Sequence, residues 1–279
     1  MQRTVTCGSN LRNESVLIVQ GVDFKYSRQR DHALQGLTFS CTVDGITSIV
    51  GKSGIGKSTL IALIAGIYIN GDPGVDEYSG QISIGGYSPE RLRGPETVSW
   101  VPQEPVLLDH LTVTENVLLP LTVNTAEHNA TSRAASLLEA LGLGMYGNVR
   151  PRSLSGGMKT RISLARALIS QPKYLFLDEP FAGIDLVNRW TIYKMLISER
   201  RRPDMTTILT SHDIPEAAIL SDRIILLSRG RETTMATVNE NQSFQPNLDK
   251  PAGCLAVARE VALPIEAVLF SDAGADRRD

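Results

Sequence analysis

The sequence predicts an α/β fold in which a mostly parallel sheet is covered by helices. Short β-prone runs alternate with helical patterns along the chain, an order typical of parallel sheets. In the first half, the run Ile46–Val50 is followed by the apolar stripe of an amphipathic helix. That stripe consists of Leu60, Leu63, Ile64 and Ile67. The second half repeats the alternation with a strand, a helix and two further strands, at Tyr174–Leu177, Leu186–Ile197, Thr206–Thr210 and Arg223–Leu227.

The composition is that of a globular protein without nucleic-acid-binding character. Hydrophobic residues make up 42% of the 279 residues, enough for a substantial core. Lysine and arginine number 28, aspartate and glutamate number 30, and the formal net charge is −2. A general nucleic-acid binder usually carries a strong basic excess, so we expect no nucleic-acid partner.

Membrane-spanning and secretory segments are not expected either. The longest apolar run, Leu60–Ile69, is ten residues long, which is half of the roughly 20 that a transmembrane helix needs. The N-terminal segment Met1–Asn10 lacks the apolar core of a signal peptide. The cysteines, Cys7, Cys41 and Cys254, are far apart and form no metal or redox motif. These features predict a soluble protein of a reducing compartment.

Local patterns assign the other segments of the first half. Residues 1–14 are polar and are expected to be flexible. The apolar spacing of 15–26 predicts a strand or a strand pair. Residues 70–79 are rich in Gly, Asp and Pro and predict an exposed loop. Gln81–Ile84 and Thr97–Val101 predict two short strands.

A mainly helical insert is predicted over about 104–171. Apolar residues at helical spacing run from Ala134 to Leu141, and a second helix is expected to begin just after Gly157 and to end at Pro172. Beyond residue 231 the pattern weakens. Residues 232–279 are therefore expected to form a C-terminal extension of unknown role.

A phosphate-binding loop is the strongest single motif. Gly51, Gly56, Lys57 and Ser58 fit the pattern G-x-x-x-x-G-K-[ST], between a predicted strand and a predicted helix. Glycines let successive backbone N–H groups point at phosphate oxygens, and the helix N-terminus adds partial positive charge. Lys57 is expected to bridge the β- and γ-phosphates, and the Ser58 hydroxyl to hold Mg²⁺. The predicted nucleotide-binding residues here are Gly51, Lys52, Ser53, Gly54, Ile55, Gly56, Lys57, Ser58 and Thr59.

Two carboxylates end the strand Tyr174–Leu177. Such a loop needs a carboxylate on a neighbouring strand to hold Mg²⁺, directly or through water, and Asp178 supplies it. Glu179 follows at once and is suited to polarise a water for attack on the γ-phosphate, a general-base role. Taken alone, the pair Asp178–Glu179 also fits a solvated strand end before a proline.

Two further features are less specific. Ser155, Gly156 and Gly157 stand at a predicted helix start and form a second anion-binding nest, or simply a helix N-cap flanked by glycines. One nucleotide does not need two such nests from one chain, so the second is expected to serve a nucleotide held by another copy. His212 follows the strand Thr206–Thr210 and is placed to donate a hydrogen bond to the γ-phosphate.

In this order the motifs resemble the nucleotide-binding subunit of an ATP-binding cassette (ABC) transporter, over about Val16 to Gly230. The matches are the A-loop at Tyr26, Walker A at Gly51–Ser58, the Q-loop at Gln103, the signature at Leu154–Met158, Walker B at Tyr174–Asp178 with Glu179, the D-loop at Ala182–Asp185 and the H-loop at Ser211–Asp213. The resemblance implies a P-loop NTPase core with a mostly parallel sheet, an antiparallel β subdomain and an inserted α-helical subdomain. The ATPase domain would span 15–231.

The resemblance also implies roles for single residues. Tyr26 would stack on adenine, and Gln103 would contact Mg²⁺ and sense the permease. The expected metal ligands are thus Ser58, Gln103 and Asp178, and the expected catalytic residues are Glu179, His212, Gln103 and Lys57. The chain has Met158, Ala182 and Ile184 where Gln, Ser and Leu are usual. None of these positions carries a catalytic group, so we expect no loss of activity.

The resemblance predicts an ATPase that energises transport of a small solute across a membrane. Gln103–Pro105, Leu111–Val117 and Asp178–Phe181 resemble the nitrate, sulfonate and taurine importers, and lipid-transport ATPases share part of this pattern. Two copies would form a homodimer head to tail, each ATP lying between the loop of one and Ser155–Gly157 of the other. The expected partners are integral membrane permease subunits, contacted around Gln103–Val117, and indirectly a solute-binding protein.

This reading places the protein on the cytoplasmic face of the inner membrane, as a peripheral subunit. Two rivals have other roles. Soluble ABC ATPases of translation or repair usually carry two cassettes or a long coiled-coil insert, and neither is present in this sequence. A non-hydrolysing nucleotide sensor would not need Glu179.

Overall fold

The computed structural model describes residues 16–27, 30–68, 74–92, 97–123, 129–200, 202, 204–229 and 234–240. The side chains of 76, 122, 123 and 234–240 are not among the described parts. The flexible N-terminus predicted for 1–14 lies outside these residues. So does most of the extension predicted for 232–279.

A six-stranded sheet forms the centre of the molecule, in the order β5-β6-β7-β3-β8-β9. Its parallel members are β3 (Ile46–Gly51), β5 (Val98–Val101), β6 (Tyr174–Leu177), β7 (Thr206–Ser211) and β8 (Arg223–Arg229). The predicted parallel sheet is confirmed. The edge strand β9 (Thr234–Glu240) pairs antiparallel to β8 and was not expected, so the sheet continues beyond residue 231.

A second, antiparallel sheet has the order β2-β1-β4, with β1 at Val16–Tyr26, β2 at Leu34–Thr42 and β4 at Val75–Ile84. It confirms the antiparallel β subdomain. The exposed loop expected for 70–79 is wrong in its second half, because residues from Val75 onward belong to β4. These polar residues pair with β1, for example Glu77 with Lys25, and the shared ladder of backbone hydrogen bonds outweighs their low strand propensity.

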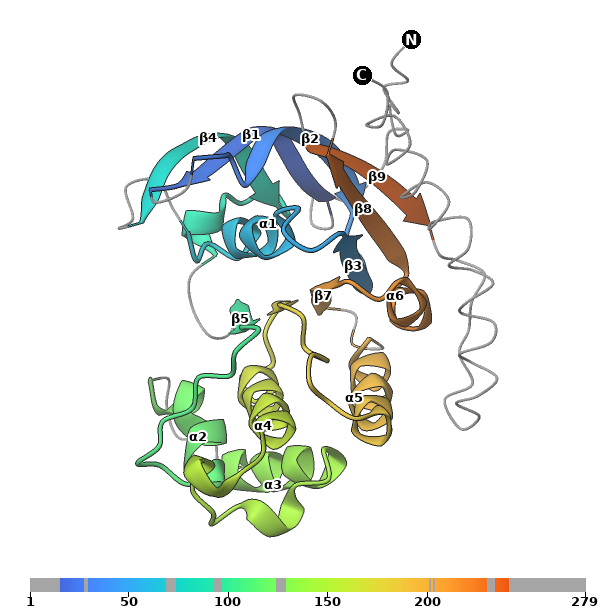
Figure 1. The fold of residues 1–279 in the computed structure, drawn as a ribbon. Coiled ribbons are helices and arrows are strands. Elements are labelled where there is room, and N and C mark those ends of the chain that lie inside the picture. Colours follow the sequence, from blue (N-terminus) through green and yellow to red (C-terminus); the bar gives the residue numbers. More distant parts are fainter. Residues whose placement is uncertain are drawn as a thin grey trace.

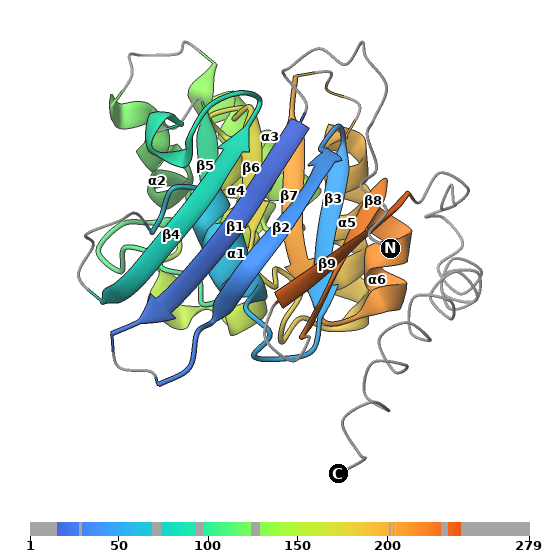
Figure 2. The ribbon, with the colours of Figure 1, turned by 90° about the horizontal axis from the view of Figure 1, so that it is seen from above.

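Helix α1 (Lys57–Ile64) lies between the two sheets (Figures 1 and 2). Its expected amphipathic stripe is not observed. Every residue of the helix except Ser58 is buried, and Ile67, beyond the helix end, is 45% exposed. A helix covered on both sides by sheets needs apolar residues all round rather than on one face.

Helices α2 (Val113–Leu118), α3 (Ala130–Ala140) and α4 (Gly156–Leu168) pack on one another in a separate lobe (Figure 1). The short turns η3 (Leu119–Val123), η4 (Gly144–Tyr146) and η5 (Pro151–Ser153) connect them, and η2 (Pro89–Arg91) follows β4. All of α2–α4 lies between β5 and β6, within the segment predicted as a helical insert. The bounds 104–171 and 15–231 stay predictions.

Two apolar cores cover the two faces of the parallel sheet. Successive residues of β6 alternate between them: Tyr174 and Phe176 join the core under α1 and the antiparallel sheet, and Leu175 and Leu177 join the other. Helices α4, α5 (Leu186–Glu199) and α6 (Ile214–Leu220) pack into that second core. A strand buried on both faces reads as a continuous apolar run, as β6 does. The buried apolar run of β6 ends at Leu177, and the polar residues Asp178 and Glu179 follow it directly.

Candidate active site

Three neighbouring strands end at one edge of the parallel sheet and bring the predicted residues together. β3 leads into the phosphate loop Gly51–Gly56, β6 into Asp178 and Glu179, and β7 into His212. β7 pairs with both β3 and β6, so the three connections are neighbours. The carboxyl ends of parallel strands are where open α/β sheets bind ligands. This edge is therefore the candidate site.

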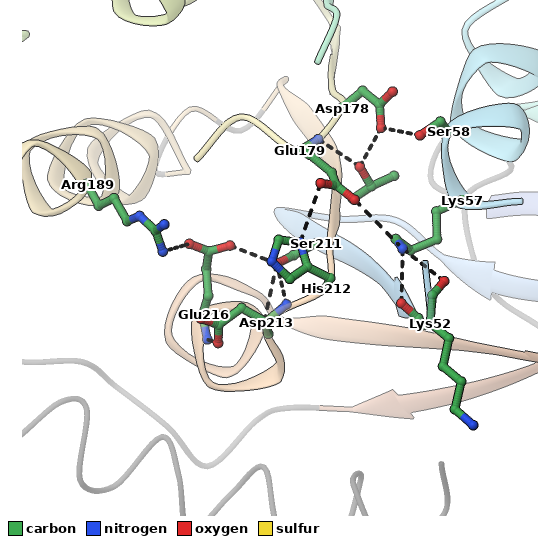
Figure 3. A network of polar contacts seen from close by, with 12 residues as sticks. Lys52, Lys57, Ser58, Asp178, Glu179, Arg189, Ser211, His212, Asp213 and Glu216 are labelled. Carbon is green, nitrogen blue, oxygen red and sulfur yellow. Dashed lines mark hydrogen bonds and ion pairs between the residues drawn. The ribbon is translucent and has the colours of Figure 1, made fainter. Parts of the chain in front are cut away.

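The Lys57 ammonium group lies within the phosphate loop. Only 4% of Lys57 is exposed, and its Nζ donates to the carbonyl oxygens of Gly51 at 2.9 Å and Lys52 at 3.2 Å. The same Nζ is 3.8 Å from Glu179 Oε1 (Figure 3). Burial lowers the pKa of Lys57, and the nearby charges of Glu179 and Asp178 oppose this shift. A buried ammonium group whose hydrogen bonds go to backbone carbonyl oxygens can exchange them for the stronger bonds to a phosphate anion.

Two glycines of the loop have left-handed backbone conformations. Gly54 and Gly56 have φ values of +77° and +104°. A Cβ on Gly56 would lie 2.5 Å from the carbonyl oxygen of Ala33, whereas a Cβ on Gly54 would have nothing within 4 Å. Among the other loop residues, Lys52 and Ser53 are exposed and Ile55 and Thr59 are buried.

This difference predicts unequal costs for two alanine substitutions. We expect Gly56→Ala to lower the free energy of unfolding by about 3 kcal/mol, because it combines backbone strain with a backbone clash. Gly54→Ala, the matched control, should cost about 1 kcal/mol, from strain alone. Urea unfolding of the nucleotide-free variants measures both. Equal losses would contradict the close packing of Gly56 against Ala33.

Ser58 and Asp178 meet as predicted. The Ser58 hydroxyl donates to Asp178 Oδ1 at 2.9 Å, and Asp178 is only 6% exposed. Hydroxyl and carboxylate oxygens are the ligand types that Mg²⁺ prefers, and Mg²⁺ usually keeps several waters besides one or two carboxylates. The two side chains therefore fit a magnesium ion bound together with a nucleotide phosphate.

Gln103 lies near this pair but is not joined to it. It stands two residues after Val101, the last residue of β5, and the backbone N–H of Asp178 donates to the carbonyl oxygen of Val101 at 2.9 Å. The Gln103 side chain is exposed, and within the described part of the chain no hydrogen bond links it to Ser58 or Asp178. Its place as a metal ligand stays a prediction.

Glu179 occupies the middle of the site (Figure 3). Its carboxylate is 17% exposed, with Oε1 3.8 Å from Lys57 Nζ and Oε2 3.4 Å from His212 Nδ1. Its backbone has φ +44°, a left-handed conformation that non-glycine residues rarely adopt. The His212 side chain is 66% exposed. The structure thus places the two expected catalytic groups side by side.

Thr210 is a site residue that the sequence interpretation missed. Its hydroxyl donates to Asp178 Oδ1 at 2.7 Å and accepts from the Glu179 backbone N–H at 2.8 Å. One buried threonine therefore orders both acidic residues. A threonine near the end of a predicted strand was visible in the sequence. Its role depends on β6 and β7 being neighbours.

Tyr26 lies against the first turn of α1, directly after the phosphate loop. Its hydroxyl lies 2.9 Å from Thr59 Oγ1, and its ring packs edge-on against Phe24 and Tyr68, with centroids 4.9 and 5.9 Å away. Burial raises the pKa of Tyr26. Stacking on adenine stays a prediction.

The second nest does not meet the phosphate loop within one chain. Ser155 is the N-cap of α4: its hydroxyl accepts from the Met158 N–H at 3.3 Å. Ser155 and Gly156 are exposed, and no hydrogen bond joins 155–157 to 51–59 among the described residues. Gly157 instead lies beside the turn before α5, where an added Cβ would be 3.6 Å from Ile184 Cγ1.

A buried acid network lies behind His212 and was also missed. Glu216, 6% exposed, accepts from the hydroxyls of Tyr193 at 2.6 Å and Ser211 at 2.7 Å. Arg189 Nη1 is 3.7 Å from Glu216 Oε1. Burial raises the pKa of Glu216, and the two hydroxyl hydrogen bonds oppose this shift. In the sequence, the spacing of Asp213 and Glu216 is typical of a helix N-terminus. This capping pattern accounts for Glu216 by itself and gives no sign of its contacts with Tyr193 and Ser211.

Two curated proteins that resemble the chain are named as import ATP-binding proteins. It is 36% identical over 226 residues to "Fe(3+) ions import ATP-binding protein FbpC 2" of Rhodococcus jostii, which covers 80% of the chain and 63% of that protein. It is 34% identical over 222 residues to "Aliphatic sulfonates import ATP-binding protein SsuB" of Corynebacterium glutamicum, covering 79% and 84%. The chain thus spans less than two thirds of the length of the iron-import relative.

A solved structure and a family model agree with these relatives. The dimeric ATP-binding cassette MJ0796, in a post-hydrolysis state bound to ADP and Pi, superposes with a TM-score of 0.69 at 25% identity, over 82% of this chain and 100% of that one. The family model described as "ABC transporter" matches residues 34–182, more than half of the chain. Together with the P-loop and its acidic partners at one sheet edge, these matches show that the chain is an ATPase domain of the ABC transporter family.

Proposed function

We propose that this protein is the ATP-hydrolysing subunit of an ABC importer that carries a small solute across a membrane. The observation that supports it most is the meeting of Lys57, Ser58, Asp178, Glu179 and His212 at one edge of the parallel sheet. The relatives named for sulfonate and ferric-ion import favour an importer over a lipid-transport or soluble ATPase. We favour a small anion such as a sulfonate as the substrate class, because the match covers 84% of the sulfonate-import relative and only 63% of the iron-import relative.

The reaction follows from the positions of the chain's own groups. Lys57 would bind phosphate oxygens through the ammonium group that now bonds the loop carbonyls. Ser58, Asp178 and Gln103 would hold Mg²⁺, which neutralises phosphate charge when bound. Glu179 would take a proton from a water molecule while the oxygen of that water bonds to the γ-phosphorus. The bond between the γ-phosphorus and the β–γ bridging oxygen would break at the same time, which releases ADP and phosphate. His212, beside Glu179, would hydrogen-bond the γ-phosphate. Tyr26 would stack on adenine.

Two copies would complete each site. The nest Ser155–Gly157, exposed at Ser155 and Gly156, makes no hydrogen bond with the phosphate loop of its own chain among the described residues, which supports a role toward the nucleotide of a partner copy. In a head-to-tail homodimer, each of two ATP molecules would lie between the phosphate loop of one copy and the Ser155–Gly157 nest of the other. ATP binding would then close the dimer, and hydrolysis would release it.

Ser155→Arg tests this arrangement. The bulky cation at the nest should lower ATP hydrolysis by about 100-fold or more, because the nucleotide would lose the hydrogen-bond donors of the partner's nest. Binding of ATP to the single chain should survive within about threefold, since the phosphate loop is untouched. Ser136→Arg, at an exposed serine of α3, is the matched control. Loss of single-chain ATP binding in Ser155→Arg alone would place the nest in cis and refute the model.

Coupling to a permease is proposed for the helical lobe. Exposed apolar side chains there include Val106, Met145 and Tyr146, and backbone hydrogen bonds join residues 113–114 to 147–149. Permease subunits would bind around Gln103–Val117, on the cytoplasmic face of the inner membrane, and a solute-binding protein would act through them. Among the residues that the structure describes, no helix has the length and apolarity to cross a bilayer. Co-purification with an integral membrane protein tests this proposal, and a protein that is never retained with membranes would refute it.

A further inference from the structure

The buried acid Glu216 lies directly behind the proposed catalytic centre, on the side away from the phosphate loop (Figure 3). Its two oxygens have different partners. Oε1 accepts from the Tyr193 hydroxyl at 2.6 Å and faces Arg189 Nη1 at 3.7 Å. Oε2 accepts from the Ser211 hydroxyl at 2.7 Å. The carboxylate therefore joins α5 to the end of β7.

The Ser211 side of this network holds the backbone on both sides of His212. Ser211 Oγ accepts from the Asp213 backbone N–H at 3.0 Å. The Glu216 N–H in turn donates to Asp213 Oδ1 at 3.0 Å. The His212 ring is 66% exposed and reaches Glu179 through a single 3.4 Å approach. An exposed ring with so little packing takes its direction from the backbone that carries it.

The Arg189 side of the network reaches the D-loop. Arg189 Nε donates to the carbonyl oxygen of Ile184 at 2.8 Å. Ile184 belongs to the turn that lies against Gly157, in the nest proposed to act on the partner's nucleotide. A small pocket is lined by both Glu179 and Glu216, and Ala182 forms part of its wall. Glu216 thus contacts Ser211, the residue before His212, and reaches the turn beside the nest through Arg189 and Ile184.

We propose that Glu216 is a positioning residue for hydrolysis. Its hydrogen bond with Ser211 fixes the backbone that points His212 toward Glu179. Its ion pair with Arg189 connects this backbone to the D-loop turn at Ile184. The proposal rests on the proposed ATPase function and adds a group that neither touches the nucleotide nor binds metal. It requires that the loss of Glu216 impairs the chemical step and leaves ATP binding intact. A role in folding alone would lower the amount of folded protein without changing turnover per folded molecule.

The experiment compares variants of the full chain. Steady-state ATP hydrolysis gives kcat and KM, a fluorescent ATP analogue with Mg²⁺ gives the binding constant, and thermal unfolding gives the folded fraction. Glu216→Ala and Ser211→Ala should each lower kcat by about tenfold, with KM and analogue binding within about twofold of wild type. The double variant should be no slower than the slower single variant, because both changes break one connection. Glu216→Gln should regain most of the rate, since its amide oxygen still accepts from Ser211.

Tyr193→Phe is the matched control within the same cluster. It removes the hydrogen bond to Oε1 and keeps the ring that packs on Phe181 and Trp190. It should lower stability and leave kcat within about twofold of wild type. The proposal fails if Glu216→Ala keeps its kcat, if the effects of Ser211→Ala and Glu216→Ala multiply, or if Tyr193→Phe slows turnover as much as Ser211→Ala.

Two features keep the test decisive. If Glu216→Ala does not fold, the kcat values of Ser211→Ala and Tyr193→Phe still test the proposal. Each of these variants removes one hydroxyl group that donates a hydrogen bond to Glu216. Wild-type turnover separates the two levels of inference. A wild-type protein that binds but never hydrolyses ATP refutes the proposed function and this role with it, whereas normal wild-type turnover with unaffected variants refutes only the role of Glu216.

Discussion

Glu179→Gln should lower ATP hydrolysis by about 100-fold to 10,000-fold while ATP binding stays within about threefold of wild type. The amide keeps the size of the side chain but cannot take the proton of the attacking water. Binding should persist because the phosphate contacts come from Lys57 and the loop backbone, not from Glu179. The variant should also accumulate an ATP-dependent dimer, because the ligand that joins the copies is no longer consumed.

Single-turnover hydrolysis and gel filtration with ATP and Mg²⁺ check this result. Glu90→Gln, at an exposed glutamate of η2, is the control and should behave as wild type. Hydrolysis by Glu179→Gln within tenfold of the wild-type rate would rule out the general-base role. A variant that stays monomeric with ATP would count against the two-copy site.

Lys57→Ala should abolish measurable hydrolysis and weaken ATP binding by about tenfold or more. The substitution removes the one side-chain cation of the loop whose charge lies inside the site. It also leaves the carbonyl oxygens of Gly51 and Lys52 without their donor and Glu179 without its nearest positive charge. Turnover and equilibrium binding of labelled ATP measure the two effects.

Lys52→Ala is the control that the structure offers. The Lys52 side chain is exposed and points away from the site, and only its carbonyl oxygen meets Lys57 (Figure 3). Its loss should leave kcat within about twofold, because any backbone in that conformation supplies the same carbonyl. If the two lysine variants lost activity equally, general positive charge rather than the buried ammonium would explain binding.

The central part of the site was accessible from sequence because its residues follow continuous local patterns. A buried apolar strand ending in Asp178–Glu179, and a glycine loop between a strand and a helix, each signal their own place at a sheet edge. Their meeting then follows from the parallel order of the strands. The contact between Ser58 and Asp178, 120 residues apart in sequence, confirms that reasoning.

What the sequence did not reveal depends on long-range neighbours. The start of β4 is polar and reads as a loop until β1 is known to pair with it. Thr210 gains a role only when β6 lies next to β7, and Glu216 reads as a helix-start residue until α5 supplies Tyr193 and Arg189. Thr210 and Glu216 are both polar, buried and held by partners from other elements. Such groups are defined by tertiary packing rather than by local spacing.

At Glu179 the left-handed backbone conformation lowers the stability of the fold, whereas the carboxylate of the same residue is proposed to be needed for ATP hydrolysis. An L-residue with φ +44° carries a conformational cost of about 1 kcal/mol that glycine would not, and asparagine would tolerate it better than most. A chain optimised for thermal resistance alone would therefore drift away from glutamate at this position. Selection for hydrolysis is what would keep Glu179 in place. Directed evolution of a more thermostable variant should therefore screen for ATP hydrolysis at every round.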